Sequence, residues 1–394
     1  MSKSLSPLSN IQVLDFSRFL PAPYCSMMLG DYGADVIRIE QPKEVMKQEK
    51  AFGRDKLSEE KKRELKRREN LTRNKRSVLL NLRNSEACEV AKKMMASTDV
   101  VIHDYRQGVM EAMGLGYDEI KKINPKIIYC CVSVSGSPES GCESVYDNMP
   151  GHDPIALALS GALPRFGDGN TPHIAGLPIG DIGTGMQATI GILLALRSRD
   201  ISGEGQFVDV AMTDCALAQM TSVFQRYLVD EKEPPLHWKG GNVGLWKTKD
   251  DQYICTTDLE LKYWKIFCQA IDRADLIPMQ FDFKQSDYLK EELTHIFLQK
   301  TRDEWFELLR EKGTQVAPVY SLAEALNDPH SRARGTVVDI KDDDGNTITQ
   351  VTSGIKLSKT PSNISHLSHQ PGEDTFSILN EMGFTNEQIE ALQK

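Results

Sequence analysis

A regular alternation of short apolar strands and helical segments in the first third of the chain places the strongest constraint on its fold. Strands are predicted at residues 11–16, 35–40, 77–82, 100–103 and 126–132, and helices at residues 22–32, 85–97 and 118–124. Strands that alternate with helices form a mostly parallel sheet with helices packed on its faces. The sequence therefore predicts the α/β fold class. Residues 17–23 follow the first strand without a G-x-G-x-x-G motif, so a standard dinucleotide site is not supported.

The later part of the chain indicates a second, smaller domain. The 394 residues are enough for two or three packing units. Charge, proline and glycine content rise at residues 231–241, which predicts a linker into a central domain. Strands are expected again at residues 335–340 and 346–351, and a helical tail at residues 373–393.

Composition argues against several classes of function and location. The chain has 47 Lys and Arg against 56 Asp and Glu, whereas a nucleic-acid binder needs a basic face. No stretch approaches the roughly 18 consecutive apolar residues of a membrane span, and the N-terminus lacks a secretory layout. Eight cysteines occur without a C-x-x-C pair, which favours reduced thiols over disulfides or zinc. We therefore expect a cytoplasmic protein, with an organelle matrix as the alternative.

One segment is basic although the chain as a whole is acidic. Residues 43–76 contain fourteen Lys and Arg against seven Asp and Glu. Residues 59–69 within it pair opposite charges at helical spacing, which is typical of a solvated helix. The positive excess is also suited to attract a small polyanionic ligand, such as a nucleotide cofactor with several phosphates. The two interpretations are compatible.

Asp181 is a candidate base or nucleophile. It lies immediately before a long apolar helical stretch at residues 182–199. Asp is a favoured N-cap residue, which would give it a purely structural role. The positive end of a helix also stabilises a carboxylate, and Gly180, Gly183 and Gly185 leave room for a ligand to approach.

A second candidate is His152, in the turn Met149-Pro-Gly-His-Asp-Pro154. Asp153 can cap the helix that follows, and Pro154 suits its first position. Most loop histidines are structural or solvated. The prolines on both sides, however, fix the direction of the chain, and rigid turns suit catalytic groups.

Three further residues are candidate ligand-binding or orienting groups. Glu260 precedes a predicted helix, where it would complement the helix dipole or orient an imidazole. Arg38 and Arg106 are candidate phosphate contacts, although surface arginines are common.

Residues 13–42 (VLDFSRFLPAPYCSMMLGDYGADVIRIEQP) resemble the carnitine and bile-acid CoA-transferase family, the class III CoA-transferases, which also contains the alpha-methylacyl-CoA racemases. The agreement continues through residues 73–82, 105–109, 124–125, the Gly-His-Asp turn, 180–209, 328–330 and 372–375. It therefore covers nearly the whole chain.

The resemblance implies a Rossmann-like large domain and a smaller α+β domain. The large domain, with linker helices, would comprise residues 1–230 and 323–394, and the small domain residues 231–322. The resemblance also implies an acyl-CoA thioester as ligand, with no cofactor beyond the CoA moiety of the substrate. In this family two chains form an interlocked homodimer with active sites at the interface.

Two reactions occur in the family. In its transferases an Asp matching Asp181 is the nucleophile and forms an aspartyl-CoA thioester; in its racemases the matching Asp is a base. The racemases also have a His in a Gly-His-Asp turn and a Glu that holds it, which match His152 and Glu260. The sequence at 180–185 resembles the matching segment of the transferases, whereas the short glycine run at 239–244 resembles that of the racemases.

These features favour an isomerase that epimerises the α-carbon of 2-methyl-branched acyl-CoA thioesters. His152 would remove the α-proton from one epimer while Asp181 delivers a proton to the other face, with the roles exchanged for the other epimer. Glu260 would orient His152, Arg38 and Arg106 would hold the CoA phosphates, and the turn at Asp153 would stabilise the enolate oxygen. The alternatives are a CoA-transferase acting through Asp181 and a catalytically silent binder of CoA thioesters.

Overall fold

The computed structural model describes residues 6–167, 169, 171–236 and 242–394, which fall into two compact units. The first unit is formed by the chain up to residue 232 and from residue 333 onward, and the second by residues 233–332. The sequence analysis predicted that the chain re-enters the large domain at residue 323. Helix α14 (Leu322–Asn327) instead belongs to the second unit, where Glu324 accepts a 2.7 Å hydrogen bond from Arg302.

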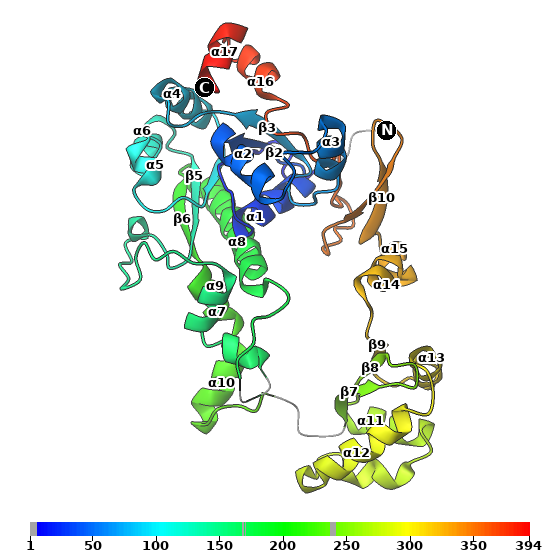
Figure 1. Cartoon of the computed structure of the whole chain (residues 1–394). Coiled ribbons are helices and arrows are strands. Elements are labelled where there is room, and N and C mark those ends of the chain that lie inside the picture. The colour runs from blue at the N-terminus through cyan, green and yellow to red at the C-terminus, as the bar shows by residue number, and fades with distance from the viewer. Residues whose placement is uncertain (1–5, 168, 170, 237–241) are drawn as a thin grey trace. The chain divides into compact units, whose positions relative to one another are not determined.

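Six parallel strands form the sheet of the first unit, in the order β3-β2-β1-β4-β5-β6 (Figure 1). Their bounds are β1 Gln12–Asp15, β2 Asp35–Glu40, β3 Lys75–Leu79, β4 Val100–His103, β5 Ile128–Ser133 and β6 Gln206–Ala211. The order reverses direction between β1 and β4, as in doubly wound nucleotide-binding folds. The parallel sheet predicted from the sequence is confirmed, and β6 is the strand that the sequence analysis did not predict.

Helices cover both faces of this sheet. Their bounds are α1 Pro21–Asp31, α2 Pro42–Ala51, α3 Glu59–Arg67, α4 Ser85–Met95, α5 Val109–Ala112, α6 Tyr117–Ile123, α7 Asp153–Leu159, α8 Ile179–Ser202, α9 Met212–Gln219, α10 Thr221–Asp230, α16 Thr375–Glu381 and α17 Asn386–Leu392. Successive strand residues point to opposite faces, so Val13 packs with α1 and α8 while Leu14 packs with α4 and α17. The expected helical tail is thus two helices.

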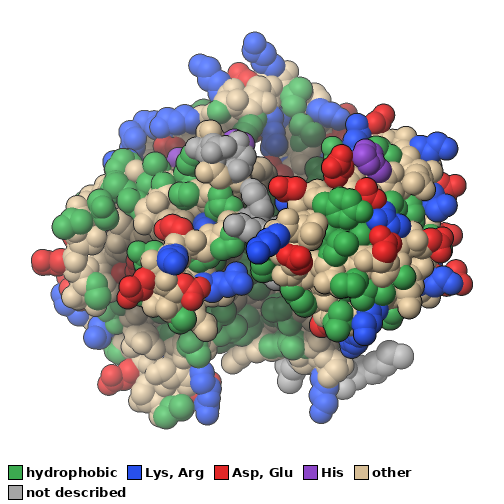
Figure 2. All heavy atoms as spheres, turned by 90° about the horizontal axis from the view of Figure 1, so that it is seen from below, with side chains coloured by type: hydrophobic (Ala, Val, Ile, Leu, Met, Phe, Trp, Pro, Cys, Tyr) green, Lys and Arg blue, Asp and Glu red, His purple; other side chains and the backbone are tan. Residues whose placement is uncertain are grey.

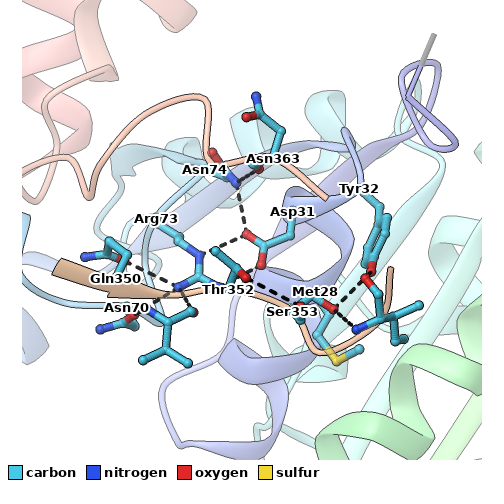
Figure 3. Close-up of polar contacts among 12 residues, drawn as sticks. Met28, Asp31, Tyr32, Asn70, Arg73, Asn74, Gln350, Thr352, Ser353 and Asn363 are labelled. Atoms are coloured by element: carbon cyan, nitrogen blue, oxygen red, sulfur yellow. Dashed lines mark hydrogen bonds and ion pairs between the residues drawn. The ribbon is translucent and has the colours of Figure 1, made fainter. Parts of the chain in front are cut away.

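The C-terminal stretch closes the first unit against its earliest elements. Arg73, which is 1% exposed, pairs with Asp31 of α1 through two of its three guanidinium nitrogens, Nε at 2.9 Å and Nη2 at 2.7 Å (Figure 3). The same guanidinium donates a 2.8 Å hydrogen bond to the Val351 carbonyl, at the end of the hairpin formed by β10 (Val337–Lys341) and β11 (Thr347–Val351). At edge strand β3, the Ser77 N–H donates to the Asp374 carboxylate.

The basic segment forms α2 and α3. On α3, Ser58 caps the first turn by accepting a hydrogen bond from the Lys61 N–H, and Lys62 pairs with Glu59. Arg67 pairs with Asp342 at 3.0 Å, in the turn of the β10–β11 hairpin. The predicted charge-paired helix is therefore confirmed.

The second unit is a small antiparallel sheet packed with helices. Its elements are β7 Val243–Lys247, β8 Tyr253–Thr257, β9 Val316–Pro318, α11 Leu261–Ala270, α12 Ser286–Phe297, α13 Arg302–Lys312, α14 and α15 Pro329–Ala333. Stacked aromatic rings fill its core, among them Trp246 and Phe297 with centroids 5.6 Å apart. This unit has its own hydrophobic core.

The surface mixes charged and apolar side chains. Figure 2 shows hydrophobic side chains between charged ones over the face that it draws. Among the described residues, α8 is the one helix long and apolar enough to cross a membrane by length and composition, and 44% of that stretch is buried. Its buried side packs against α1 and β5, as in the core helix of a globular domain.

Candidate active site

A cavity of about 390 Å³ opens at the carboxyl ends of the strands, beside the reversal between β1 and β4. Segments that follow β1, β4 and β5 line it, together with the turn before α7 and the first turn of α8. Ligands of open parallel sheets bind outside the strand carboxyl ends at such a reversal. The cavity contains both His152 and Asp181 in its lining, so the fold brings these two predicted residues together.

Asp181 lies in the first turn of α8, and it is not the N-cap residue. The helix begins at Ile179 after Pro178, so the structural N-cap interpretation of Asp181 is wrong. The backbone N–H of Asp181 donates a 3.0 Å hydrogen bond to Oδ1 of Asp153, which supplies the missing cap from another element. The Asp181 side chain is therefore free of capping and lines the cavity.

The surroundings of Asp181 favour its neutral form. Burial raises the pKa of the Asp181 carboxyl to about 6, and the neighbouring charge of Asp153 contributes in the same direction. The charge of His152 acts in the opposite direction and lowers the pKa of Asp181, as expected for an imidazole that lines the same cavity. A carboxyl group with this pKa can exchange a proton near neutral pH.

His152 immediately precedes α7. Its carbonyl accepts the Ile155 N–H at 2.9 Å, so its main chain begins the helix. Asp153, expected as the cap of this helix, is its first residue, and Pro154 is the second. His152 is exposed and lines the cavity. Its ring meets the Phe19 ring edge to face, with the two ring centroids 5.4 Å apart. The rigid turn thus holds His152 at the cavity wall.

Both predicted phosphate contacts lie near the same strand ends. Arg106 follows β4 and lines the cavity. Arg38, near the end of β2, lines an adjoining depression, where it pairs with Glu40 at 3.1 Å. Nε of Arg38 is buried without a hydrogen-bond partner among the described residues. An unpaired guanidinium N–H suits an anionic ligand.

The sequence analysis missed several residues of this region. Arg18 and Tyr105 line both the cavity and the adjoining depression, with the guanidinium 4.5 Å from the ring centroid. Arg18 also pairs with Asp104 at 3.4 Å. His103 is buried in the cavity lining, and this burial lowers the pKa of its imidazole to about 4. Their position at the end of a predicted strand or just beyond it was the available signal.

Glu260 belongs to the second unit, where it directly precedes α11. Its Oε2 accepts a 3.2 Å hydrogen bond from the Gln315 side chain, and its carboxylate is exposed. Glu260 is the N-cap residue of α11, and its side chain makes no capping hydrogen bond to the first turn of that helix. Among the described residues, no cluster of His, Cys, Asp and Glu could hold a metal ion.

Comparison with known proteins identifies the family of this site. The sequence model of CoA-transferase family III matches residues 8–375. The chain belongs to CoA-transferase family III. The resemblance seen in the sequence is thereby confirmed, and the cavity with its carboxylate and arginines lies in a chain of the acyl-CoA enzyme type.

Relatives within CoA-transferase family III include both reaction types. The chain is 28% identical to alpha-methylacyl-CoA racemase of Mus musculus, with 97% of this chain and 95% of the relative covered. It is 32% identical to the beta subunit of succinyl-CoA–L-malate CoA-transferase of Chloroflexus aurantiacus, with 98% and 97% covered. A CAIB/BAIF family protein from Brucella suis has the same fold, with a TM-score of 0.81, 23% identity, and 96% and 99% coverage.

Proposed function

We propose that this chain is an isomerase that epimerises the α-carbon of 2-methyl-branched acyl-CoA thioesters. The observation that carries the proposal is that His152 and Asp181 line one cavity within electrostatic range of each other. Epimerisation removes a proton from one face of a planar enolate and adds one to the other. An imidazole together with a carboxyl group whose pKa is raised to about 6 suits that reaction.

The remaining residues of the site would bind and orient the thioester. Arg38, Arg106 and the basic segment are proposed to hold the CoA phosphates, because guanidinium groups bind phosphate oxygens in pairs. The backbone N–H of Asp153 is the proposed donor to the enolate oxygen, and loss of one such donor typically costs about 3 kcal/mol of barrier. No cofactor beyond the CoA moiety is needed for this chemistry.

We further propose that the active unit is an interlocked homodimer. The outer face of α8 exposes a stripe of apolar side chains at helical spacing, including Leu194, which is 66% exposed. Helix α10 buries none of its residues, and its Leu228 is 74% exposed. Contiguous apolar surface of this kind is typical of protein interfaces. In such an assembly Glu260 would orient the His152 imidazole.

We propose that the protein is cytoplasmic. All eight cysteines are free, and six of them are buried. Reduced, unpaired thiols are typical of a reducing compartment.

A CoA-transferase acting through Asp181 is the second candidate. The 32% identical relative, a subunit of a succinyl-CoA–L-malate CoA-transferase, supports it. In that reaction, Asp181 of this chain would be the nucleophile. With a pKa of about 6, the Asp181 carboxyl group is mostly ionised at pH 7 and suits either reaction, whereas only the isomerase uses the His152 imidazole that lines the same cavity. We therefore rank the isomerase first.

Incubation of one 2-methylacyl-CoA epimer in deuterium oxide, without an acceptor acid, separates the candidates. The isomerase predicts uptake of deuterium at the α-carbon together with loss of optical purity. A transferase predicts no exchange until a carboxylic acid is added, and then movement of CoA to that acid. Absence of both reactions would identify a silent binder.

His152→Ala tests the assignment of the proton carriers. We expect the exchange rate to fall by about 10²–10⁴-fold, the usual contribution of one general acid or base. His173→Ala is the matched control, because His173 is also exposed but does not line the cavity. Near-normal epimerisation by the His152 variant would refute the two-base assignment.

A further inference from the structure

We propose that Asp153 is a positioning residue for Asp181: its buried side chain fixes the main chain of Asp181, and its negative charge opposes ionisation of the Asp181 carboxyl group. The proposal deepens the proposed function and rests on it, since it concerns a carboxyl group that must hold and release a proton. It gives the Asp153 side chain a role separate from that of its backbone N–H.

The geometry joins the starts of two helices. Asp153 is the first residue of α7 and is 6% exposed. Its Oδ1 accepts the Asp181 N–H at 3.0 Å, across 28 residues of sequence. A Cβ atom at Gly180 would lie 2.9 Å from the same Oδ1, so this approach requires glycine at position 180. The Asp181 main chain is therefore held by a buried acceptor that cannot move far.

The same geometry places two carboxyl groups beside each other in a partly buried site. The charge of Asp153 acts on Asp181 in the same direction as burial, and only His152 opposes it. The other charged or titratable groups that line the cavity are Arg18, His103, Asp104, Tyr105, Arg106, Glu111, Cys131 and Glu139. A like charge close by disfavours ionisation, as in other carboxyl pairs.

The chemical consequence is a larger supply of protonated Asp181. Between a pKa of 3.8 and one of about 6, the protonated fraction at pH 7 rises roughly a hundredfold. An acid that delivers a proton to the enolate must be protonated when the substrate binds. The ordinary carboxyl group would almost always be ionised at that moment. Burial is the larger cause of the raised pKa, and the charge of Asp153 adds to it.

Asp153→Asn separates the charge from the hydrogen bond, because the amide oxygen still accepts the Asp181 N–H. The carboxyl carbon of Asp181 is followed by NMR in aspartate-labelled, substrate-free protein and assigned by comparison with Asp181→Asn. In the wild type it should titrate near pH 6, and in Asp153→Asn at a clearly lower pH. The acid limb of the kcat/KM profile should move to lower pH by the same amount, with the alkaline limb unmoved.

Other variants separate the remaining explanations. Asp153→Glu retains the charge and should keep the titration of Asp181 closer to the wild-type value than Asp153→Asn does. A purely structural role predicts an unchanged titration in Asp153→Asn, and that result would overturn the proposal. So would a wild-type Asp181 that titrates near pH 4, which remains measurable if the variants do not fold. Because the titration needs no substrate, a failure of epimerisation would refute the proposed function without affecting this test.

Discussion

The Asp181 carboxyl group lowers the stability of the fold at neutral pH, while its raised pKa suits it to proton transfer. Its carboxyl group is surrounded by protein that favours the neutral form, and burial raises its pKa to about 6 from an ordinary value of 3.8. Folded protein therefore binds this proton more tightly than unfolded protein does. The group costs nothing below pH 3.8, where both states are protonated, and its cost is complete above about pH 6.

Replacement of Asp181 by Asn should therefore stabilise the fold at neutral pH while it abolishes turnover. The rise of the Asp181 pKa from 3.8 to about 6 corresponds to about 3 kcal/mol, which we reduce to about 1 kcal/mol because the side chain is partly exposed. Urea unfolding at pH 7.5 and at pH 4.5 measures this. The gain should be present at pH 7.5 and shrink at pH 4.5. A variant less stable than the wild type at pH 7.5 would contradict the expectation.

Residue types and local turns predicted individual candidates but not their partners. His152 stood out because the flanking prolines make its turn rigid, and Asp181 because a helix start stabilises a carboxylate and the nearby glycines leave room for a ligand. The hydrogen bond from the Asp181 N–H to Asp153 was not predictable, because it joins separate helices that meet only after the sheet has formed. The sequence therefore offered Asp181 itself as the cap, which is incorrect.

At the scale of elements, buried strands were predicted closely and packed helix ends were not. The strands at 35–40 and 100–103 have the predicted bounds: both lie inside the sheet, the first (DVIRIE) has apolar residues alternating with charged ones, and the second (VVIH) is a nearly continuous apolar run. Edge strand β6 is half-buried over most of its length, which weakens its apolar pattern. Helix α8 begins three residues earlier than predicted, through a glycine-rich stretch of low helix propensity.

Packing explains that early start. A Cβ atom at Gly185 would lie 2.6 Å from the Pro21 carbonyl oxygen, so α8 and α1 approach backbone to backbone. The contact compensates for the helix propensity that the glycines lack. Propensity alone could not show this, because the partner helix lies more than 150 residues earlier in the chain.

The arginines that link elements around β3 differ in burial, which gives a matched pair of variants. Arg73→Ala removes one partner of the buried Arg73–Asp31 pair, whose side chains are each 1% exposed. We expect a loss of about 3–5 kcal/mol in the free energy of unfolding, because Asp31 is left as an uncompensated buried charge. Urea denaturation measures the loss.

Arg76→Ala is the control for this prediction. Arg76 of β3 pairs with Asp35 of the neighbouring strand β2, and the two side chains are 32% and 43% exposed. The expected loss is below about 1 kcal/mol, because exposed ion pairs contribute little. Equal losses in the two variants would show that burial does not set the strength of these links.

At the scale of the whole molecule, the exposed stripe on α8 should decide the state of assembly. Leu194→Asp places a charge on this stripe without disturbing the core, since Leu194 is 66% exposed. We expect light scattering after size-exclusion chromatography to show monomer in place of dimer. Val145→Asp, at a position 93% exposed in a loop, should leave the dimer intact. A dimeric Leu194 variant would place the interface elsewhere.

The closure of the first unit by its last residues has a consequence for biosynthesis. Residues that complete this unit leave the ribosome only after the whole second unit, and domains tend to fold as they emerge. Until Asp374 reaches Ser77, strand β3 is an open edge able to pair with other chains. The nascent protein therefore passes through a stage vulnerable to aggregation, and loss of the final segment by a premature stop codon would make that stage permanent.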